Sequence, residues 1–571
     1  MMNSINIALL GNSTTDYIAS SLSEECKRHG ISASIYNSPF NQYQQEVLNP
    51  VSGFYASAPE LALLLLEGRL LFPEWYDFTF LRSDDKEKAS EIQTVFDSIV
   101  SVVEKIHQNS GTKILVNNFK IPYHTPLGIL DNKSGMGLKQ MIAHLNQKLE
   151  EFASDKEYVY IFDYNGLSSH FGHIRAESRK MYYITKSLTS FSFSKLLAKE
   201  YMRYILPLKS KTKKCLVLDL DNTLWGGVAG EDGLSGIKLD ISGAGRAFYD
   251  FQQEIVSLHS KGIILAVNSK NNYEDAVNII ENHPHMLLRK KYFSCLKINW
   301  QNKADNLKEI ANELNIGVDS LVFFDDSPVE REFVKTALPQ VTVVEVPEDA
   351  SKYAEALREL VEFESLSITE EDINRNKMYE ESRKRNEILQ HSKDLEEFLK
   401  NLESKVVIEY ANPFNIPRIA QLTQKTNQFN MTTKRYLVED IENMAGSGEY
   451  KVFSCSVSDK FGDNGIVGVC IVKTEAPKAF IDTFLLSCRV LGRNVEFAFL
   501  SGIVGILREN GFDSITALYI RTEKNKANQD FYSQAGFMKI NEKDGMVSYI
   551  LNSRDKLKEF KHIDVSIKKE E

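Results

Sequence analysis

The sequence contains no long apolar run. A membrane-spanning helix needs about 20 consecutive apolar residues, and the best candidate, LALLLLEGRLLF, is short and interrupted by Glu67, Gly68 and Arg69. The first residues, MMNSINIALLGNSTTDY, have no basic stretch ahead of an apolar segment and are typical of a strand followed by a turn. We therefore expect no membrane association, no signal peptide and a cytoplasmic location.

Excess positive charge and paired cysteines are also missing. The 78 aspartate and glutamate residues outnumber the 68 lysine and arginine residues, which gives a net charge of −10. Nucleic acid is therefore not expected as a partner. The cysteines form no C-x-x-C pair, which argues against a disulfide framework or a zinc site and fits a reducing compartment. They are Cys26, Cys215, Cys295, Cys455, Cys470 and Cys488.

What remains is the composition of an ordinary globular protein, with 43% hydrophobic and 26% charged residues among 571. This length predicts three to four domains. No internal repeat and no low-complexity tract interrupts the chain, so we place boundaries where the pattern of strands and helices changes. The resulting segments are 1–204, 205–349, 350–404, 405–552 and 553–571.

These segments predict different structures. The first two alternate apolar strand-like runs, such as INIALLG and YVYIFDYNG, with amphipathic stretches, which indicates parallel α/β sheets. Residues 350–404 are charged and helical in pattern, and we interpret them as a helical linker. Residues 405–552 begin with strands and have a late helix, which predicts an α+β domain. The last residues are expected to form a solvated tail.

Two acidic pairs in the second segment carry the strongest functional signal. Asp219 and Asp221, in DLDNT, directly follow the strand-like run CLVL, and Asp325 and Asp326 directly follow LVFF. Burying an unpaired carboxylate costs several kcal/mol, so such an arrangement implies a cation. Strand ends of a parallel sheet meet at its carboxyl edge, where ligands usually bind. Oxygen ligands from two strands suit Mg²⁺.

Two further pieces lie between these pairs. Ser269 ends a third strand-like run and precedes Lys270 and Asn271, so a hydroxyl and backbone amides can meet a phosphate there. Lys303 begins a predicted helix, whose N-terminus favours an anion together with the ammonium group. The order along the chain is therefore acidic pair, serine, lysine, acidic pair.

This order resembles the four motifs of the haloacid-dehalogenase superfamily of phosphotransferases. By this resemblance, Asp219 attacks phosphorus, Asp221 is the general acid and base, and Ser269 and Lys303 hold the phosphoryl oxygens. Thr223 and Asn271 are further expected binding residues. The resemblance implies a metal site for Mg²⁺ among four aspartates, Asp219, Asp221, Asp325 and Asp326. Only about 45 residues separate the first two motifs, which is too short for a large cap domain, so we expect a capless Rossmann-like phosphatase domain.

Longer stretches narrow the resemblance. DLDNTLWGGVAGEDG, INW-x-x-K and FFDDSPVERE are similar to the FkbH-like branch of that superfamily, over roughly residues 205–550. Members of this branch take a three-carbon unit from 1,3-bisphosphoglycerate, remove its phosphate and load glyceryl onto the thiol of an acyl carrier protein. The resemblance therefore implies a phosphorylated three-carbon substrate and a carrier-protein partner.

The pattern of the C-terminal segment predicts, in order, two strands, a loop, a helix, a strand and a helix. This order resembles the GNAT acyltransferase fold. In that fold an R/Q-x-x-G-x-G/A loop cradles a pyrophosphate at a helix N-terminus. Here Arg489 and Gly492 match, but Asn494 stands at the last small position. The departure weakens the case for acetyl-CoA and leaves a carrier-bound phosphopantetheine arm as the alternative to CoA. Asn528 and Tyr532 match positions that lie near the thiol end of the ligand in GNAT proteins. An equally good interpretation is that Asn528 is a helix cap and Tyr532 a core aromatic residue.

Cys488 directly precedes that loop. The FkbH-like resemblance around it implies that it carries the acyl unit as a thioester, and a thiol beside Arg489, near Arg493 and a helix N-terminus, favours the thiolate. The competing interpretation is a packed strand residue, which we assign to Cys455 and Cys470. No histidine occurs between His391 and His562, so this domain holds no cysteine–histidine pair of its own.

The N-terminal block ALLGNST resembles the G-D-S block of SGNH hydrolases, with Ser13 at the nucleophile position and Asn12 in place of aspartate. The D-x-x-H block is not matched, because Asp163 lies seven residues before His170. We expect an SGNH-like or flavodoxin-like scaffold for docking, with Ser13 as a helix N-cap. His170 and His173 lack acidic or cysteine neighbours in the sequence and are expected in a solvated loop.

Together these features predict a cytoplasmic α/β enzyme that combines a Mg²⁺-dependent phosphatase with an acyltransferase. One alternative is an acyltransferase of a polysaccharide or natural-product pathway that acylates an amino sugar. Another is a free-standing phosphatase whose flanking domains only bind a partner.

Overall fold

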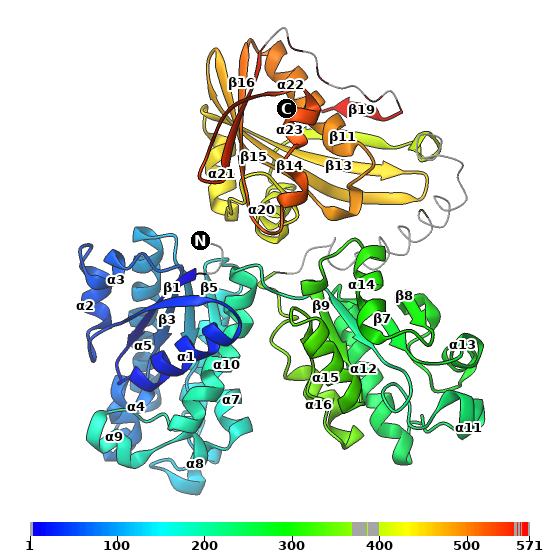
Figure 1. Ribbon diagram of the computed structural model, residues 1–571. Coiled ribbons are helices and arrows are strands. Elements are labelled where there is room, and N and C mark those ends of the chain that lie inside the picture. Colours follow the sequence, from blue (N-terminus) through cyan, green and yellow to red (C-terminus); the bar gives the residue numbers. More distant parts are fainter. Residues whose placement is uncertain are drawn as a thin grey trace. The chain divides into compact units, whose positions relative to one another are not determined.

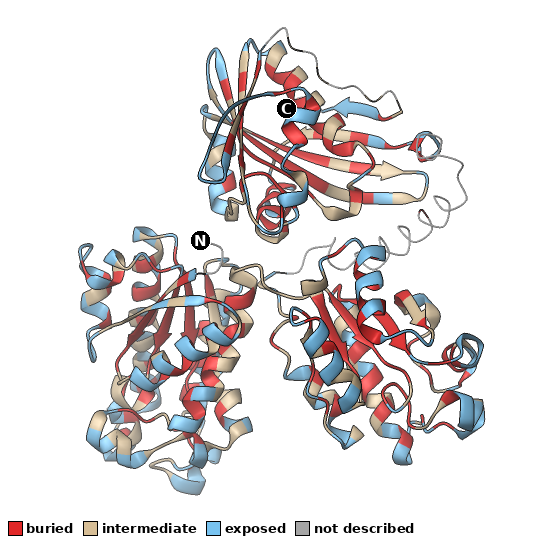
Figure 2. Cartoon of the chain, viewed as in Figure 1, coloured by how far each residue is buried: buried red, intermediate tan, exposed pale blue. Residues whose placement is uncertain are grey.

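The computed structural model describes residues 4–367, 385, 399–552, 555, 557, 560 and 562–568. The chain forms two compact units, Met1–Lys209 and Ser210–Glu571, and the second unit contains two sheets (Figure 1). Buried residues concentrate on the strands of each sheet (Figure 2). Among the described residues, no helix combines the length and apolar character needed to cross a bilayer.

The N-terminal unit is a parallel sheet with the strand order β2-β1-β3-β4-β5, a flavodoxin-type order. Every residue of the LALLL run of β3 is buried, as expected for a central strand covered on both faces. The strands are β1 (Ser4–Gly11), β2 (Ser32–Asn37), β3 (Leu61–Leu65), β4 (Lys113–Asn117) and β5 (Val159–Phe162). The helices are α1 (Asp16–Arg28), α2 (Tyr43–Leu48), α3 (Gly53–Ala56), α4 (Gly68–Leu71), α5 (Asp85–Asn109), α6 (Leu138–Ala153), α7 (Tyr164–Phe171), α8 (His173–Ala176), α9 (Arg179–Thr185) and α10 (Phe191–Leu208).

The central sheet is also parallel, with the order β10-β9-β6-β7-β8. Its strands are β6 (Cys215–Leu218), β7 (Ile264–Ser269), β8 (Phe293–Ile298), β9 (Leu321–Phe324) and β10 (Thr342–Val343). Its helices are α11 (Ala229–Gly236), α12 (Arg246–Ser260), α13 (Tyr273–Asn282), α14 (Lys303–Glu313), α15 (Pro328–Ala337) and α16 (Tyr353–Arg358). Between β6 and β7 the chain forms only turns, α11 and α12, and α12 packs into the core through Phe251 and Ile255. The predicted capless architecture is therefore confirmed.

The C-terminal sheet is mixed, with the order β17-β18-β16-β15-β14-β13-β11-β19 and β12 paired to β15. Its strands are β11 (Lys405–Tyr410), β12 (Phe429–Asn430), β13 (Tyr450–Asp459), β14 (Gly462–Glu475), β15 (Lys478–Leu486), β16 (Ser514–Ile520), β17 (Met538–Lys543), β18 (Met546–Asn552) and β19 (Asp564–Ile567). Its helices are α20 (Ile416–Lys425), α21 (Val438–Gly446), α22 (Val495–Glu509) and α23 (Phe531–Ala535). The predicted succession of two strands, loop, helix, strand and helix appears as β14, β15, α22, β16 and α23.

Three expectations about organisation need correction. Residues 350–358 form a 3₁₀ turn and α16 rather than a linker, because Tyr353 and Leu357 complete the central core; most of the remaining predicted linker lies outside the described residues. The segment expected to be only a solvated tail contributes the exposed strand β19, which pairs with β11. The C-terminal domain has two early helices, and α20 buries the regularly spaced Ile416, Ile419 and Leu422.

Candidate active site at the carboxyl edge of the central sheet

Two neighbouring strands bring Asp219 and Asp325 together. Asp219 follows β6 and Asp325 follows β9, and the register pairs Leu218 with Phe324 at the ends of these strands. The backbone amide of Asp219 also donates a hydrogen bond to the carbonyl oxygen of Phe324. Asp325 is completely buried and Asp219 is 7% exposed. The two carboxylates therefore meet at the edge where ligands of parallel sheets bind.

Lys303 supplies the charge that compensates these aspartates. Its Nζ lies 3.0 Å from Asp219 Oδ2 and 2.5 Å from Asp325 Oδ2, and the residue is 3% exposed. Lys303 is the first residue of α14, where the Asn302 side chain caps the helix. The Asn268 side chain donates to the Lys303 carbonyl oxygen. The lysine is therefore fixed at both backbone and side chain.

The site shifts the pKa values of its groups. Burial and the neighbouring Asp219 charge raise the pKa of Asp325 to about 7. The same two causes raise the pKa of Asp326. Burial lowers the pKa of Lys303, but the charges of Asp219 and Asp325 raise it by more, so the net shift is upward. A charged lysine shared by two carboxylates is the arrangement in which close acidic groups remain compatible with folding.

Asp221 is held apart from this cluster by three donors. Trp225 Nε1 and the Ala229 amide donate to its Oδ1, both at 3.0 Å, and Asn271 Nδ2 donates to its Oδ2 at 2.9 Å. Burial raises the pKa of Asp221, although these hydrogen bonds oppose the shift. A carboxyl that is fixed in position and has a raised pKa is a candidate for general acid and base catalysis.

The aspartate cluster fits a divalent cation. One carboxylate oxygen from each of Asp219, Asp325 and Asp326 lies within 4.8 Å of the others. The buried Asp219 Oδ1 has no hydrogen-bond partner among the described residues, so an acceptor remains available for a ligand. An all-oxygen donor set from few carboxylates suits Mg²⁺. Asp221 is not part of this group, and its oxygens accept hydrogen bonds from Trp225, Ala229 and Asn271. Its assignment as a metal ligand stays a prediction.

The remaining predicted residues surround the cluster. Thr223 Oγ1 accepts a hydrogen bond from the Asp326 amide at 3.3 Å and donates to Asp326 Oδ1 at 3.4 Å. Ser269 is buried at the end of β7, where its carbonyl oxygen accepts from the Asn299 amide. Asn271 donates a hydrogen bond to Asp221, and its predicted binding role stays a prediction. The phosphate-binding role of Ser269 stays a prediction.

Two residues at this site were not foreseen. Trp225 fixes Asp221, as described above, and Arg331 in α15 donates from Nη1 to the carbonyl oxygens of Asp325 and Asp326, at 2.8 and 2.7 Å. Arg331 therefore fixes the backbone that presents the second acidic pair. Its place in FFDDSPVERE, on the first turns of the helix after that pair, is the signal that could have identified it.

Cys488 lies in a different setting, in a 3₁₀ turn directly after β15. It is the least buried cysteine of the chain, since the other five are all fully buried. The neighbouring cations are engaged elsewhere: Arg489 Nε donates to Ser487 Oγ at 3.1 Å, and Arg493 donates to Asp459 Oδ2 at 3.2 Å. The structure thus leaves Cys488 partly exposed, and each arginine has a hydrogen-bond partner other than its thiol.

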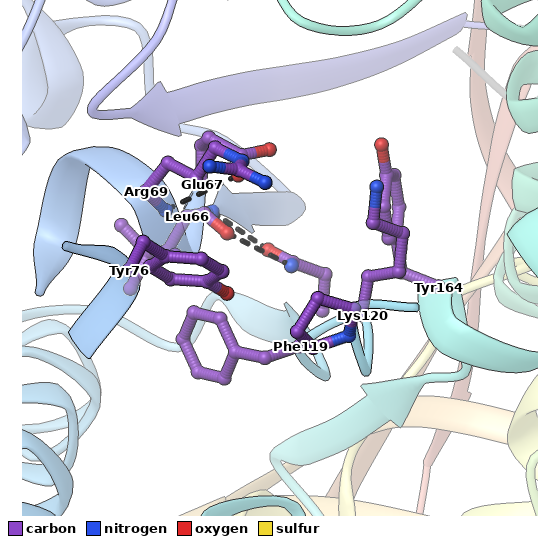
Figure 3. Close-up of a pocket in the computed structure, with 10 residues that line it drawn as sticks. Leu66, Glu67, Arg69, Tyr76, Phe119, Lys120 and Tyr164 are labelled. Carbon is purple, nitrogen blue, oxygen red and sulfur yellow. Dashed lines mark hydrogen bonds between the residues drawn. The ribbon is translucent and has the colours of Figure 1, made fainter. Parts of the chain in front are cut away.

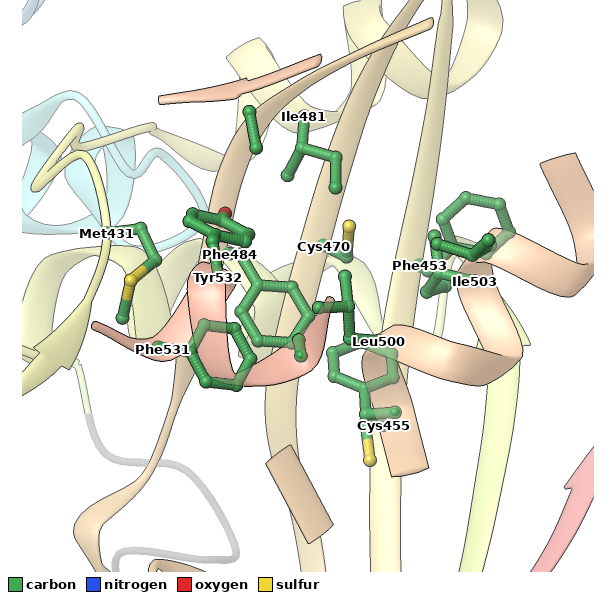
Figure 4. Packing of buried hydrophobic residues seen from close by; sticks show 14 of the residues in the cluster. Met431, Phe453, Cys455, Cys470, Ile481, Phe484, Leu500, Ile503, Phe531 and Tyr532 are labelled. Carbon is green, nitrogen blue, oxygen red and sulfur yellow. The ribbon is translucent and has the colours of Figure 1, made fainter. Parts of the chain in front are cut away.

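The loop after Cys488 explains its departure from the expected motif. Gly492 and Asn494 both have positive φ, of 77° and 64°, and asparagine is one of the few side chains that adopts this conformation readily. Asn528 donates to the Gln428 carbonyl oxygen at 2.8 Å. The Tyr532 side chain packs in the aromatic core with Phe484 and Phe531 (Figure 4), and its buried hydroxyl has no partner among the described residues.

The N-terminal unit departs from two of the expectations drawn from its sequence. Helix α1 starts at Asp16 with Thr15 at the N-cap position, so Ser13 is not the cap that the sequence predicted. Thr15 turns its hydroxyl to Asn37 instead. His170 and His173 lie on the short helices α7 and α8 rather than in a loop, and His173 Nδ1 is 3.3 Å from Ser168 Oγ.

Comparisons with known families agree with this architecture. Residues 6–205 match the family described as FkbH, N-terminal domain. Residues 214–343 match the family described as NLI interacting factor-like phosphatase. These ranges cover the first sheet and the central sheet with its aspartate cluster, so the central domain is a phosphatase domain of the haloacid-dehalogenase type.

Solved structures give a more specific comparison. The N-terminal part of the protein BF1531 from Bacteroides fragilis, which contains a phosphatase domain and is complexed with Mg, is 30% identical, with a TM-score of 0.59. The match covers 64% of this chain and 95% of that chain. The chain therefore belongs to the FkbH-like family.

The ribosomal-protein-S18-alanine N-acetyltransferase from Escherichia coli matches with 13% identity and a TM-score of 0.21, over 26% of this chain and 93% of that chain. A score this low supports no inference, so the GNAT-like interpretation of the C-terminal sheet depends on its own topology and motifs. A comparison with curated proteins finds no match.

Proposed function

We propose that this protein is a bifunctional phosphatase and acyltransferase that dephosphorylates a three-carbon acyl unit and transfers it to the thiol of an acyl carrier protein. One observation carries the proposal: Asp219 and Asp325 share the buried ammonium of Lys303, while Asp219 Oδ1 has no hydrogen-bond partner among the described residues. An acceptor left over at the ligand edge of a parallel sheet supports a nucleophile that is also a metal ligand.

At the central site, Asp219 would attack the phosphorus of a phosphate ester. The bond between the Asp219 oxygen and phosphorus forms as the bond to the leaving oxygen breaks, and Asp221 donates a proton to that oxygen. Water then attacks the aspartyl-phosphate, Asp221 takes its proton, and inorganic phosphate leaves. The three hydrogen bonds to Asp221 support this role because they fix its position.

Mg²⁺, when bound by Asp219, Asp325 and Asp326, would neutralise charge on the phosphoryl oxygens. Lys303 holds the two buried carboxylates together and, with Ser269, would bind the remaining phosphoryl oxygens. Arg331 and Thr223 keep the second acidic pair in place. The BF1531 fragment, complexed with Mg, supports the choice of metal by similarity.

In the C-terminal domain, the Cys488 thiolate would attack the acyl phosphate of 1,3-bisphosphoglycerate. The carbon–sulfur bond forms, the carbon–oxygen bond to the phosphate breaks, and inorganic phosphate leaves. The phosphate ester remaining on the tethered unit would then be removed at the central site. The glyceryl group would finally pass to the phosphopantetheine thiol of the carrier protein. The exposure of Cys488 relative to the other cysteines supports this assignment.

Intact-protein mass spectrometry after exposure to 1,3-bisphosphoglycerate tests both halves. Cys488→Ala should acquire no adduct but still hydrolyse phosphate esters. Asp219→Asn should stop with a phosphorylated adduct on Cys488, heavier than the wild-type adduct by about 80 Da, the mass of one HPO₃ group. A peptide map that places the adduct on Cys455 or Cys470 would contradict the proposal.

The same experiment separates the other candidate functions. Phosphate release with no covalent acyl-enzyme in any variant would favour the free-standing phosphatase. Transfer from a thioester to an amino sugar, unaffected by Cys488→Ala, would favour the sugar acyltransferase, in which the cysteine is a packed strand-end residue.

A further inference from the structure

A cavity in the N-terminal unit lies at the carboxyl edge of its sheet. Its walls come from the segments directly after three adjacent strands, β3, β4 and β5 (Figure 3). The lining residues that the argument uses are Glu67, Arg69, Tyr76, Phe119, Lys120 and Tyr164. The carboxyl edge is the usual ligand position in an open parallel sheet.

Paired amide contacts build the loop that forms one wall. The Asn12 side chain accepts from the Glu67 amide at 2.7 Å and donates to the Glu67 carbonyl oxygen at 3.1 Å. Asn117 makes the same two contacts with the backbone of Leu66, again at 2.7 and 3.1 Å. This loop is therefore held from two neighbouring strands, which preorganises the residues that follow it.

Arg69 is the cation that this wall presents. Its guanidinium lies 4.6 Å from the centre of the Tyr76 ring, and its side chain forms no ion pair and no hydrogen bond with any residue that the structure describes. A guanidinium stacked on an aromatic ring still has its donors available in the ring plane, where they match the oxygens of a carboxylate or phosphate.

The opposite wall is charged but already paired. Lys120 forms an ion pair with Glu177, and the Tyr164 ring lies beside it in the cavity lining. Glu67 is half-buried, and its Oε1 accepts a hydrogen bond from the Arg69 backbone amide rather than from the guanidinium. Burial raises the pKa of Glu67.

The lining contains no serine, cysteine or histidine. We propose that this cavity is a binding site for the carboxylate or phosphate group of a small organic acid, with Arg69 as the residue that binds the oxyanion. Tyr76 and Phe119 provide the apolar walls that exclude water from the contact. The site is independent of the central aspartates, which lie in the other compact unit.

Isothermal titration calorimetry of the full chain with EDTA and without Mg²⁺ tests this site. D-glycerate and glycerol 3-phosphate represent the two oxyanions, and glycerol is the neutral probe. We expect saturable binding of at least one anion and none of glycerol. D-glycerate alone would identify a carboxylate site, and glycerol 3-phosphate alone a phosphate site. Equal binding of glycerol, or no saturable binding of either anion at millimolar concentrations, would overturn the proposal.

Matched variants assign the binding to this cavity. Arg69→Gln should weaken the affinity at least tenfold, whereas Arg82→Gln, which removes an exposed arginine over Phe78, should leave it unchanged. Glu67→Gln should bind the anion as tightly or more tightly, since it removes an acid beside the ligand. Equal affinity in Arg69→Gln and the wild type, or a loss in Glu67→Gln as large as in Arg69→Gln, would refute anion recognition here. Phosphatase turnover of the same variants reports separately on the central site.

Discussion

The central aspartate cluster and the loop at Cys488 use their charged residues in opposite ways. In the cluster, Lys303 is committed to two carboxylates, yet Asp219 Oδ1 is left without a partner among the described residues. At the loop, Arg493 contacts buried Asp459 and Arg489 contacts Ser487. In the first region Lys303, Asp219, Asp325 and Asp326 lie together at a ligand position. In the second region the arginines contact other residues of the fold. A functional site is recognised by the groups that remain available after the fold has been satisfied.

Removing Lys303 should have the largest effect. Lys303→Met leaves Asp219 and Asp325 buried without a cation, so we expect a loss of about 3–5 kcal/mol in the free energy of unfolding and no phosphatase activity. Chemical denaturation without metal measures the first quantity. Lys308→Met, which removes an exposed lysine paired with Asp305, is the control and should cost at most about 1 kcal/mol. Equal stability of both variants would show that Lys303 does not compensate the aspartates.

The cysteines offer a second contrast. Iodoacetamide should label Cys488 in the native protein at least tenfold faster than any other cysteine, because the other five are buried. Burial also raises the pKa of Cys26 to about 12 and raises those of Cys455 and Cys470. Peptide mapping over time measures the rates. Comparable labelling of Cys455 would mean that exposure does not single out Cys488.

Mg²⁺ binding should depend on pH through Asp325. Its pKa in the folded metal-free protein is raised to about 7. The contribution of this carboxyl to the free energy of unfolding is therefore fully present below about pH 4, where it is neutral in both states, and is lost as the pH rises through 7. Mg²⁺ needs the ionised form, so the rise in Tm on adding Mg²⁺ should grow between pH 5 and 8. Asp325→Asn should lack this growth, and a pH-independent Mg²⁺ effect in the wild type would contradict the assignment.

The smallest expected effect concerns Asn494. Asn494→Ala should destabilise the protein by about 1 kcal/mol, because its φ of 64° is unfavourable for alanine. Asn494→Gly should be nearly neutral, since glycine adopts this conformation without a steric cost. Denaturant titration of the two variants measures the difference. If alanine is tolerated as well as glycine, the asparagine is kept for a contact rather than for its backbone conformation.

The site residues that could be predicted from the sequence are those that directly follow a strand. Asp219, Ser269 and Asp325 follow apolar runs, and parallel strands carry such residues to one edge. Sequence reasoning could not predict side-chain direction. Asp221 lies two residues from Asp219, yet its oxygens face Trp225 and Asn271.

Sequence reasoning also missed features that depend on contacts distant in the chain. The packing of Tyr353 into the central core and the pairing of β19 with β11 extend two domains beyond their predicted limits. The contact between Arg493 and Asp459 spans 34 residues, so no local motif revealed that this arginine is engaged. Local patterns fix strands and helices, whereas such long-range pairs are visible only in the folded chain.

Phosphate release by Asp219→Asn tests the central claim most directly. With p-nitrophenyl phosphate and Mg²⁺, the wild type and the control Asp305→Asn, which alters an exposed aspartate of α14, should both turn over. Asp219→Asn should be folded, with a circular dichroism spectrum like the wild type, and should lose at least about three orders of magnitude in kcat, since an amide is a poor nucleophile and loses a metal ligand. Turnover by folded Asp219→Asn at the wild-type rate would contradict the assignment of this cluster as the phosphatase site.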